Sequence, residues 1–549
     1  GRPNAGSGSN HSRTNPSVVR TASTGPTDTT NSADMVFTTD ETKLYSAGAE
    51  SDDEANRAGR EADRGGDEAE WADRGDDGTE WGDRGDDEAE WADSERSRAT
   101  RVRAFTNGEV PVAVYGLGKM GLPLAATFAD VTGNTVGVDV DESVVTATNR
   151  GECHVVNEPG LPDLIEETVD RGALRATTDG DEAARGAALH VVVVPTLLDG
   201  DRRADLSLVR EVGRTVGRGL DPGDVVVLES TVPPGTCRST LLPLLEAESG
   251  LDAGEFGLAF CPERTASGRA LRDIRGAYPK VVGGVDPEST AVAELVYDQV
   301  TDNEVFPVSD AATAEAVKVF EGLYRDVNIA LANQVALAGT QLDIDVREAI
   351  ETANTQPLCS ILDPGPGVGG HCIPVYPYFL INELDGDLPL LSAARAINDR
   401  MPAFAVDRVR AALAERGVSI DGARVAVFGL TYKANVAETR NAPARDVVGG
   451  LADAGAEVLG VDPLVDDAEA GTFAPARVVD IDDVGGETGG GDVVGDDPLD
   501  AVVVVTPHRQ FLAFDWDRLP EDCLVVDCHD ALDPVTVGRP VYTLAAGFQ

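Results

Sequence analysis

Short apolar runs rich in β-branched residues alternate with helical stretches along most of this chain, and this alternation limits the folds available to it. From Val110 the runs are PVAVYGLG, TVGVDVD, LHVVVVPT, DVVVLEST, FGLAFCPE and PKVVGGV. Near residue 310 they stop, and after Asp421 they return as RVAVFGL, EVLGVDP, AVVVVTPH and CLVVDCHD. Such alternation favours a parallel, doubly wound sheet with helices on both faces. We therefore predict two separate α/β domains.

A long helical pattern separates the two α/β segments and runs from about Ala311 to Ala338. Its apolar residues recur at three- and four-residue steps and form one stripe. Lys318 lies on a different face of the same helix. The stripe consists of Val317, Phe320, Tyr324, Val327, Leu331 and Val335.

A glycine-rich loop follows the first predicted strand and leads into the helical run LPLAATFAD. Its glycines permit a tight turn and let backbone N–H groups approach a pyrophosphate at a helix N-terminus. The next strand ends at Asp139, 18 residues past Gly121, where a carboxylate can accept from a ribose 2′-OH. This order predicts a Rossmann-like domain that binds NAD rather than NADP. The loop consists of Gly116, Leu117, Gly118, Lys119, Met120 and Gly121.

Residues 1–107 are rich in Asp, Glu, Gly, Ser, Thr and Arg and have almost no apolar periodicity. We expect this acidic tail to be disordered, because it buries too little apolar surface to offset the entropy of ordering. A ten-residue unit recurs in it and places Trp71, Trp81 and Trp91 in register. We favour a low-complexity expansion over a partner-docking tail. Met35 is the first methionine, which leaves open whether the leading residues belong to the native product.

The charge balance is strongly acidic, with 96 Asp and Glu against 45 Lys and Arg and a formal net charge of −51. This argues against a nucleic-acid partner or an anionic membrane surface, because both require basic contacts. We interpret the excess as adaptation to a salt-rich cytoplasm, where ions screen the self-repulsion. The few lysines then mark positions where a small ammonium is required. They are Lys43, Lys119, Lys280, Lys318 and Lys433.

The seven cysteines are odd in number, are scattered along the chain and contain no C-x-x-C pair. This pattern fits a reduced intracellular compartment. No apolar run approaches the ~18–20 residues that span a bilayer, so we expect a cytoplasmic protein without a membrane partner. His371 next to Cys372, and the group Cys523, Cys528 and His529, lack paired metal-ligand spacing, so we expect no metal.

The run GVGGHCIP at 367–374 resembles the UDP-glucose/GDP-mannose dehydrogenase family, and within it most closely the UDP-N-acetylmannosamine dehydrogenase branch. Six further segments resemble the same family in the same order, so the resemblance covers about 108–549. They are NRGECHVVNEPGL (149–161), VPT (194–196), STVPPGT (230–236), CPER (261–264), RDVNIALANQV (325–335) and GLTYKANVAETRNAPARD (429–446).

The resemblance implies three domains after the acidic tail. These are an NAD-binding Rossmann domain at 108–308, a central helical dimerisation domain at 309–418, and a UDP-binding Rossmann-like domain at 419–549. It also implies a homodimer and a four-electron, NAD-dependent oxidation of a UDP-sugar C6 alcohol to a carboxylate, which supplies polysaccharide or glycan synthesis. UDP-N-acetylmannosamine is the first expectation for the substrate, with UDP-N-acetylglucosamine and UDP-glucose as alternatives.

The implied chemistry explains why a cysteine is needed. A thiolate adds to the C6 aldehyde, the adduct is oxidised to a thioester, and water cleaves the thioester. By resemblance Cys372 is the nucleophile, and Lys318 is the cation that stabilises the oxyanion. Thr231 and Glu263 match positions that place water and the nicotinamide, and Thr196 matches a cofactor contact. The residues expected to bind the nucleotide sugar are Arg325, Asn328, Gly367, Gly369, Gly370, Lys433 and Arg440.

Two positions depart from the family pattern. Gly322 stands four residues after Lys318, where the family commonly has Asn, and Tyr376 stands four residues after Cys372, where it commonly has Asp. The glycine could admit a water or a bulkier sugar group, and the tyrosine could still donate and accept a hydrogen bond. We favour a working variant enzyme over a silent nucleotide-sugar-binding or regulatory protein. A two-electron β-hydroxyacid dehydrogenase would leave the second α/β domain unexplained.

Overall fold

The computed structural model describes residues 43–45, 85–266, 268–342, 344–384, 386–485 and 498–549. The first sheet has eight strands in the order β10-β9-β8-β7-β4-β1-β2-β3. All neighbours in it are parallel except β8 and β9. The strands are β1 (Val112–Tyr115), β2 (Thr135–Val138), β3 (Leu174–Thr177), β4 (Leu189–Val192), β7 (Val225–Leu228), β8 (Gly257–Phe260), β9 (Lys280–Gly284) and β10 (Val305–Pro307).

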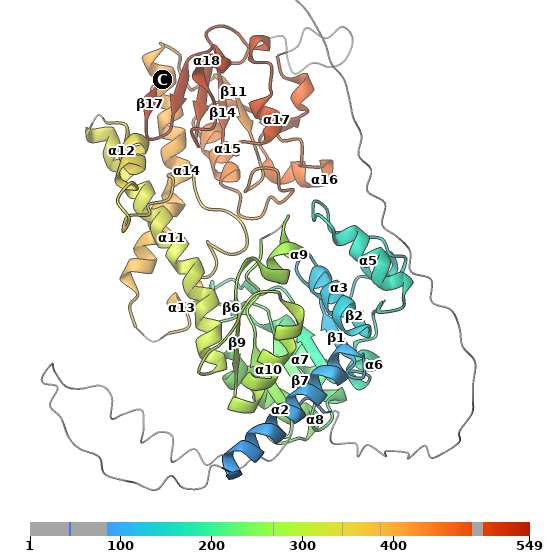
Figure 1. Cartoon of the computed structure of the whole chain (residues 1–549). Helices are drawn as coiled ribbons and strands as arrows, with labels where there is room; N and C mark the ends of the chain where they lie inside the picture. The colour runs from blue at the N-terminus through green and yellow to red at the C-terminus, as the bar shows by residue number, and fades with distance from the viewer. Residues whose placement is uncertain (1–42, 46–84, 267, 343, 385, 486–497) are drawn as a thin grey trace, which may run out of the picture. The chain divides into compact units, whose positions relative to one another are not determined.

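Helices cover both faces of this sheet (Figure 1). One hydrophobic core lies between the sheet and helices that include α3 and α10, and a second lies between the opposite face and helices that include α7. The central strands are buried along their whole length, which is why they contain Val, Leu and Ala without alternation. The helices are α3 (Gly121–Thr132), α4 (Glu142–Asn149), α5 (Leu161–Asp170), α6 (Gly180–Arg185), α7 (Ser207–Gly219), α8 (Leu242–Ser249), α9 (Ala270–Arg272) and α10 (Pro287–Val300).

Two short strands and two π-helical turns complete the described part of this domain. Strands β5 (Leu197–Leu198) and β6 (Ala204–Asp205) form a two-stranded antiparallel ribbon. Single π-helical turns at Cys237–Leu241 and Asp273–Ala277 lie directly before α8 and directly after α9.

Helix α2 (Gly85–Thr106) precedes the first strand and corrects the expectation that disorder extends to residue 107. Ala104 and Phe105 at its end are buried, and the Phe105 ring lies edge-on to that of Phe128 at a centroid distance of 6.5 Å. Arg101 in its C-terminal half donates to Glu288 of α10 at 2.8 Å. The first two repeat tryptophans, and the rest of the expected tail apart from 43–45, lie outside the described residues, as does the Trp91 side chain.

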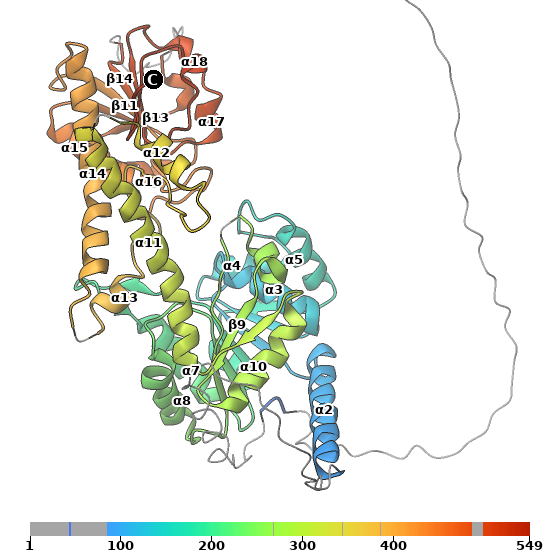
Figure 2. The same ribbon diagram turned by 60° about the vertical axis from the view of Figure 1, so that its left-hand side comes forward.

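The central segment consists of helices (Figure 2). Helix α11 (Ala311–Leu342) packs along α14 (Pro389–Glu415), and the short helices α12 (Val346–Ala353) and α13 (Tyr378–Ile381) lie between them in sequence. With 32 residues, α11 is about 48 Å long. Its buried face consists largely of small residues, whereas the predicted apolar stripe exposes Phe320, Tyr324 and Leu331.

The second sheet has seven strands in the order β13-β12-β11-β14-β15-β16-β17, all parallel except the last pair. It confirms the second α/β domain expected from the sequence. Its strands are β11 (Arg424–Phe428), β12 (Glu457–Val461), β13 (Arg477–Val479), β14 (Ala501–Val504), β15 (Leu524–Asp527), β16 (Val541–Thr543) and β17 (Gly547–Phe548). Its helices are α15 (Pro443–Asp453), α16 (Asp467–Ala470), α17 (Arg509–Leu512) and α18 (Pro534–Val537), with 3₁₀ turns at Gly471–Phe473, Ile481–Asp483 and Trp516–Arg518. None of the helices in the described ranges is both long and apolar enough to span a bilayer.

Candidate active site

The glycine loop has the geometry that a dinucleotide needs. Gly116 has φ +94°, and a Cβ on it would lie 2.3 Å from the carbonyl oxygen of Val193. A Cβ on Gly121 would lie 1.8 Å from the carbonyl oxygen of Gly116, so only glycine allows helix α3 to start this close to the strand. Gly118 is exposed, and a Cβ there would meet open space. The first and third glycines therefore form the turn, and the middle one lines open space for a ligand.

The acid predicted to accept from the ribose lies beside this loop. Asp139 directly follows β2, and its Oδ2 accepts from the backbone N–H of Leu117 at 2.8 Å. Its Oδ1 accepts from Asp141 N at 3.0 Å, which leaves each oxygen a further lone pair for a ligand hydroxyl. Thr196 Oγ1 is buried and has no partner among the described residues. The loop, the carboxylate and the unsatisfied hydroxyl together fit NAD, which accepts hydride when bound.

The other two loop residues point to different neighbours. Lys119 Nζ lies 3.2 Å from Glu438 Oε2, and its side chain is about half exposed. The Met120 sulfur accepts from Thr265 Oγ1 at 2.8 Å. Lys119 thus pairs with the carboxylate of Glu438. Met120 links the cofactor loop to the segment after β8 through its contact with Thr265.

Three of the four predicted catalytic residues meet at the carboxyl ends of two sheet strands. Thr231 follows β7 and Glu263 follows β8. Lys318, half-buried on α11, donates from Nζ to the backbone carbonyl of Glu263. Glu263 itself is buried, and its Oε1 has no partner among the described residues. Ligands in open α/β sheets bind at this end of the strands, so the cluster lies where a substrate is expected.

Tyr376 joins this cluster to the predicted nucleophile. Its hydroxyl lies 3.3 Å from Thr231 Oγ1, and the phenol also interacts with the neighbouring Cys372 thiol. Burial, followed by the proximity of Cys372, raises the pKa of Tyr376 well above its ordinary value, so the phenol keeps its proton. Cys372 is an exposed free thiol. The cysteine, the threonine and the tyrosine therefore lie together, with the tyrosine between the other two.

The glycines before Cys372 lie in close contact with another part of the chain. A Cβ on Gly369 would lie 2.6 Å from the carbonyl oxygen of Asn441, and one on Gly370 would lie 2.7 Å from the Tyr432 ring. A Cβ on Gly367 would lie 3.0 Å from the Pro443 side chain. The loop is thus pressed against the chain between β11 and α15, and two hydrogen bonds hold it there. They are Gly370 N to Arg440 O at 3.1 Å and Asn441 Nδ2 to Gly370 O at 3.0 Å.

The predicted sugar-binding side chains are mostly on the surface. Arg325, Lys433 and Arg440 are exposed, and Arg440 Nη1 lies 3.1 Å from His371 Nδ1. Asn328 supports the chain that leads to the cysteine loop. Its Nδ2 donates to Ser360 O at 2.6 Å, and its Oδ1 accepts from Leu362 N at 2.9 Å.

Sequence reasoning missed Glu438, which lies within the motif GLTYKANVAETR. Its Oε2 is 3.0 Å from His371 Nε2, beside the nucleophile, as well as being the partner of Lys119. Burial works to raise the pKa of Glu438, but His371 and Lys119 outweigh it and hold the pKa below its ordinary value. The two basic partners are far away in sequence, so only the acid's position in the motif could have marked it.

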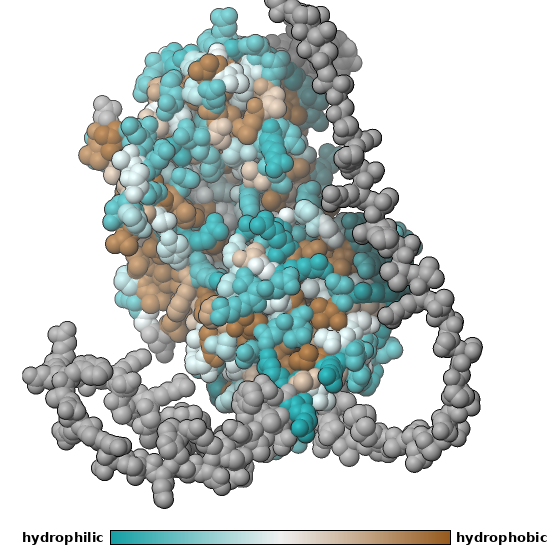
Figure 3. Space-filling view, in the orientation of Figure 1, coloured by the Kyte–Doolittle hydropathy of each residue, from teal (hydrophilic) through white to brown (hydrophobic). Residues whose placement is uncertain are grey.

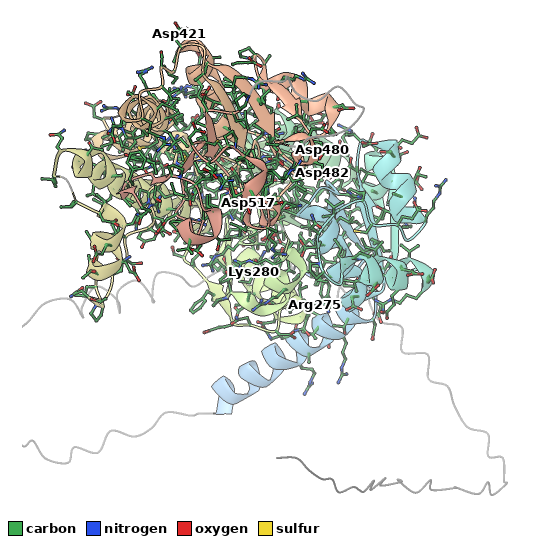
Figure 4. The ribbon with its side chains drawn as sticks, turned by 90° about the horizontal axis from the view of Figure 1, so that it is seen from above. Arg275, Lys280, Asp421, Asp480, Asp482 and Asp517 are labelled. Atoms are coloured by element: carbon green, nitrogen blue, oxygen red, sulfur yellow. The ribbon has the colours of Figure 1, made fainter. Side chains whose placement is uncertain are left out.

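A buried network under the site was also missed. Lys280 Nζ donates to Glu229 Oε2 at 2.9 Å, and Tyr297 donates to the other oxygen of Glu229. Lys280 also lies 4.4 Å from the centroid of the Tyr297 ring. Figure 4 labels Lys280 within this first domain. Glu229 lies two residues before Thr231, so the network fixes the end of β7. The scarcity of lysine was the signal that could have found it.

Comparison with known proteins identifies the family of this chain. Family models for the UDP-glucose/GDP-mannose dehydrogenases match residues 110–301 (NAD-binding domain), 312–400 (central domain) and 426–534 (UDP-binding domain). The chain belongs to this family. A UDP-N-acetyl-D-mannosamine dehydrogenase from Pyrococcus horikoshii is 36% identical over 432 residues, which cover 78% of this chain and 97% of that protein.

Solved structures of family members agree with the fold. A UDP-N-acetylmannosamine dehydrogenase structure from Pyrococcus horikoshii is 34% identical with a TM-score of 0.70, and the match covers 80% of this chain and all of that one. A UDP-glucose dehydrogenase from Pyrobaculum islandicum is 26% identical with a TM-score of 0.69, and the match covers 80% and 98%. This family member is therefore an NAD-dependent nucleotide-sugar dehydrogenase with two Rossmann-like domains and a UDP-sugar substrate.

Proposed function

We propose that the chain oxidises C6 of UDP-N-acetyl-D-mannosamine to the carboxylate, with Cys372 as the nucleophile and two NAD⁺ consumed per sugar. The contact of Tyr376 with both Cys372 and Thr231 carries this proposal, because it brings the thiol to the strand ends where Lys318 and Glu263 also lie. The aldehyde formed first would be captured as a thiohemiacetal and oxidised to a thioester, which water cleaves.

The positions of the surrounding groups support a role for each in this proposal. The Lys318 ammonium, already directed to a carbonyl oxygen, would stabilise negative charge on the C6 oxygen. Glu263 has a buried carboxylate oxygen without a partner in the described residues, which suits it to position a water. Exposed Lys433 and Arg440 would meet the diphosphate or its sugar.

The sugar is chosen on similarity to the named relatives. The Pyrococcus horikoshii relative is a UDP-N-acetyl-D-mannosamine dehydrogenase at 36% identity, whereas the Pyrobaculum islandicum UDP-glucose dehydrogenase is at 26%. The product would be a UDP-sugar uronate for polysaccharide or glycan synthesis. UDP-N-acetylglucosamine and UDP-glucose are the alternatives to test.

The decisive experiment measures NADH at 340 nm with each of the three UDP-sugars in molar KCl. Two NADH per UDP-N-acetylmannosamine, and at least tenfold lower kcat/KM for the others, support the proposal. Cys372→Ser should form no NADH beyond the aldehyde stage. The matched control is Cys359→Ser, because Cys359 is the other cysteine of the central segment and its sulfur contacts Asn354. Full turnover by Cys372→Ser would show that Cys372 is not the nucleophile. If the unmodified protein formed no NADH with any UDP-sugar, a silent binding protein would be favoured.

We further propose that the protein is a homodimer that works in a salt-rich cytoplasm. Phe320, Tyr324 and Leu331 of the stripe are each about half exposed, and apolar side chains gather over α11 (Figure 3). Such a stripe is typical of a helix that packs against another protein surface. All seven cysteines are free, which suits a reducing compartment.

A further inference from the structure

Gly322 and Tyr376 are two parts of one packing arrangement. Gly322 is buried on α11, one helical turn after Lys318, and a Cβ on it would lie 2.4 Å from Cδ2 of Tyr376. The next nearest atoms, Cγ and Cβ of the same tyrosine, would lie at 3.2 and 3.3 Å. The space next to the glycine therefore holds the tyrosine ring. This corrects the expectation that Gly322 admits a water or a bulkier sugar group.

Moving the Tyr376 ring would cost packing energy, because the ring belongs to a small hydrophobic core. Tyr376 packs with Val319, Val375, Phe379 and Leu380, all of them buried. Its ring centroid lies 5.8 Å from that of Phe379. Any side chain at position 322 would have to displace this packed ring, so glycine there is a requirement of the tyrosine.

The fixed ring places the phenol hydroxyl between two reactive groups. Tyr376 is 8% exposed, and its hydroxyl contacts Thr231 Oγ1 at 3.3 Å as well as the Cys372 sulfur. Either hydroxyl can donate in the first contact. When Thr231 donates to the phenol oxygen, the phenol proton points to the sulfur. Since the phenol stays protonated, it can act as a donor and not as a base.

We propose that Tyr376 is a catalytic residue that donates a hydrogen bond first to the Cys372 thiolate and then to the oxyanion formed on C6. This role rests on the proposed function. When the thiolate adds to the aldehyde, a C–S bond forms and the carbonyl π pair moves to oxygen, so one negative charge passes from sulfur to oxygen. The phenol hydroxyl then donates its hydrogen bond to the C6 oxygen instead of the sulfur, and keeps its proton. Lys318, one turn before Gly322, faces the same charge as a cation.

The test uses Tyr376→Phe, which keeps the ring and its packing and removes only the hydroxyl. We expect kcat to fall about 100-fold, which is typical for loss of one oxyanion donor, with KM values for NAD and the UDP-sugar within about twofold. Alkylation of Cys372 by iodoacetamide, followed by peptide mass spectrometry without cofactor or sugar, should slow at least threefold at pH 7.5. The control is Tyr378→Phe, because the Tyr378 hydroxyl contacts Arg202 instead.

A double-mutant cycle tests the role of the glycine. Gly322→Ala should lower kcat about as much as Tyr376→Phe when Tyr376 is present, and should have less than a twofold effect in a Tyr376→Ala background. Thermal unfolding of each variant identifies any that fail to fold. If the added methyl were equally harmful in both backgrounds, the pairing would be wrong.

Two results would overturn the catalytic role of Tyr376, and they can be told apart from each other. If Tyr376→Phe keeps kcat within twofold and its Cys372 is alkylated at the normal rate, the hydroxyl is dispensable while the dehydrogenase function stands. If the unmodified protein makes no NADH with any UDP-sugar, the proposed function and the catalytic role fall together. Slower alkylation in Tyr376→Phe would then leave only a structural contact with the thiol.

Discussion

Replacing Lys280 with Met should destabilise the first domain more than any loss at an exposed lysine. The Glu229 side chain is fully buried and that of Lys280 is 15% exposed, so removing the ammonium leaves a carboxylate in an apolar surrounding. Breaking a buried pair in this way costs about 3–5 kcal/mol. Glu229 keeps its hydrogen bond from Tyr297 and can also take up a proton. We therefore expect the loss in the free energy of unfolding to lie near the lower limit of this range, about 3 kcal/mol. Burial already raises the pKa of Glu229, which makes protonation easier.

The assay is thermal unfolding by calorimetry in molar KCl. For a domain of about 200 residues, 1 kcal/mol shifts Tm by about 2–4 °C, so Lys280→Met should lower Tm by about 6–12 °C. The double variant Glu229→Gln, Lys280→Met should recover at least half of that loss, because no unpaired charge remains. Lys433→Met, at an exposed position, is the control and should shift Tm by less than about 2 °C. A Tm for Lys280→Met within 2 °C of the unmodified protein would refute the reasoning.

Asp139→Ala should raise the KM for NAD about 10- to 150-fold, because a ribose hydroxyl loses a charged acceptor worth about 1.5–3 kcal/mol, and should leave the KM for the sugar unchanged. Phe320→Asp should convert a dimer to a monomer in light scattering after gel filtration, whereas Glu321→Ala on the next face should not. Burial works to raise the pKa of Asp462, but His508 and the N–H groups of Leu464 and Thr431 outweigh it and lower the pKa. A carboxyl whose pKa is lower in the folded state than in the unfolded chain stabilises the fold at pH values above its unfolded-state pKa. The Tm of the C-terminal domain should therefore fall as the pH drops below about 4, and the drop should be smaller in Asp462→Asn.

The architecture could be predicted from the sequence because strand and helix periodicities are local signals. The runs PVAVYG and RVAVFG became β1 and β11, each an interior strand of its sheet. The antiparallel pairing of β9 with β8 left no such signal, since both are buried runs of the same character. Helix α2 was missed because its charged composition hid a few buried apolar residues near its end, such as Phe105.

The site was predictable where a motif fixes the residue and unpredictable where two distant segments meet. The motifs named Thr231, which follows β7, and Lys318, whose ammonium contacts the backbone of Glu263 after β8. The pairing of Gly322 with Tyr376 joins residues 54 positions apart, and in the sequence each was only a departure from the family pattern. Together they fill one volume, which only the folded chain reveals. Nor could the sequence tell that the glycines before Cys372 make room for Tyr432.

Helix α11 also limits which changes in chain length the protein can tolerate. Lys318 contacts Glu263 near one end of the helix, while Asn328 and Asn333 further along it hold the chain at Ser360, Leu362 and Gly365. One inserted or deleted residue between Lys318 and Asn328 would rotate one set of contacts against the other by about 100° and shift it by about 1.5 Å. Natural length variation should therefore be absent from this stretch of α11 and confined to the loops beyond its ends.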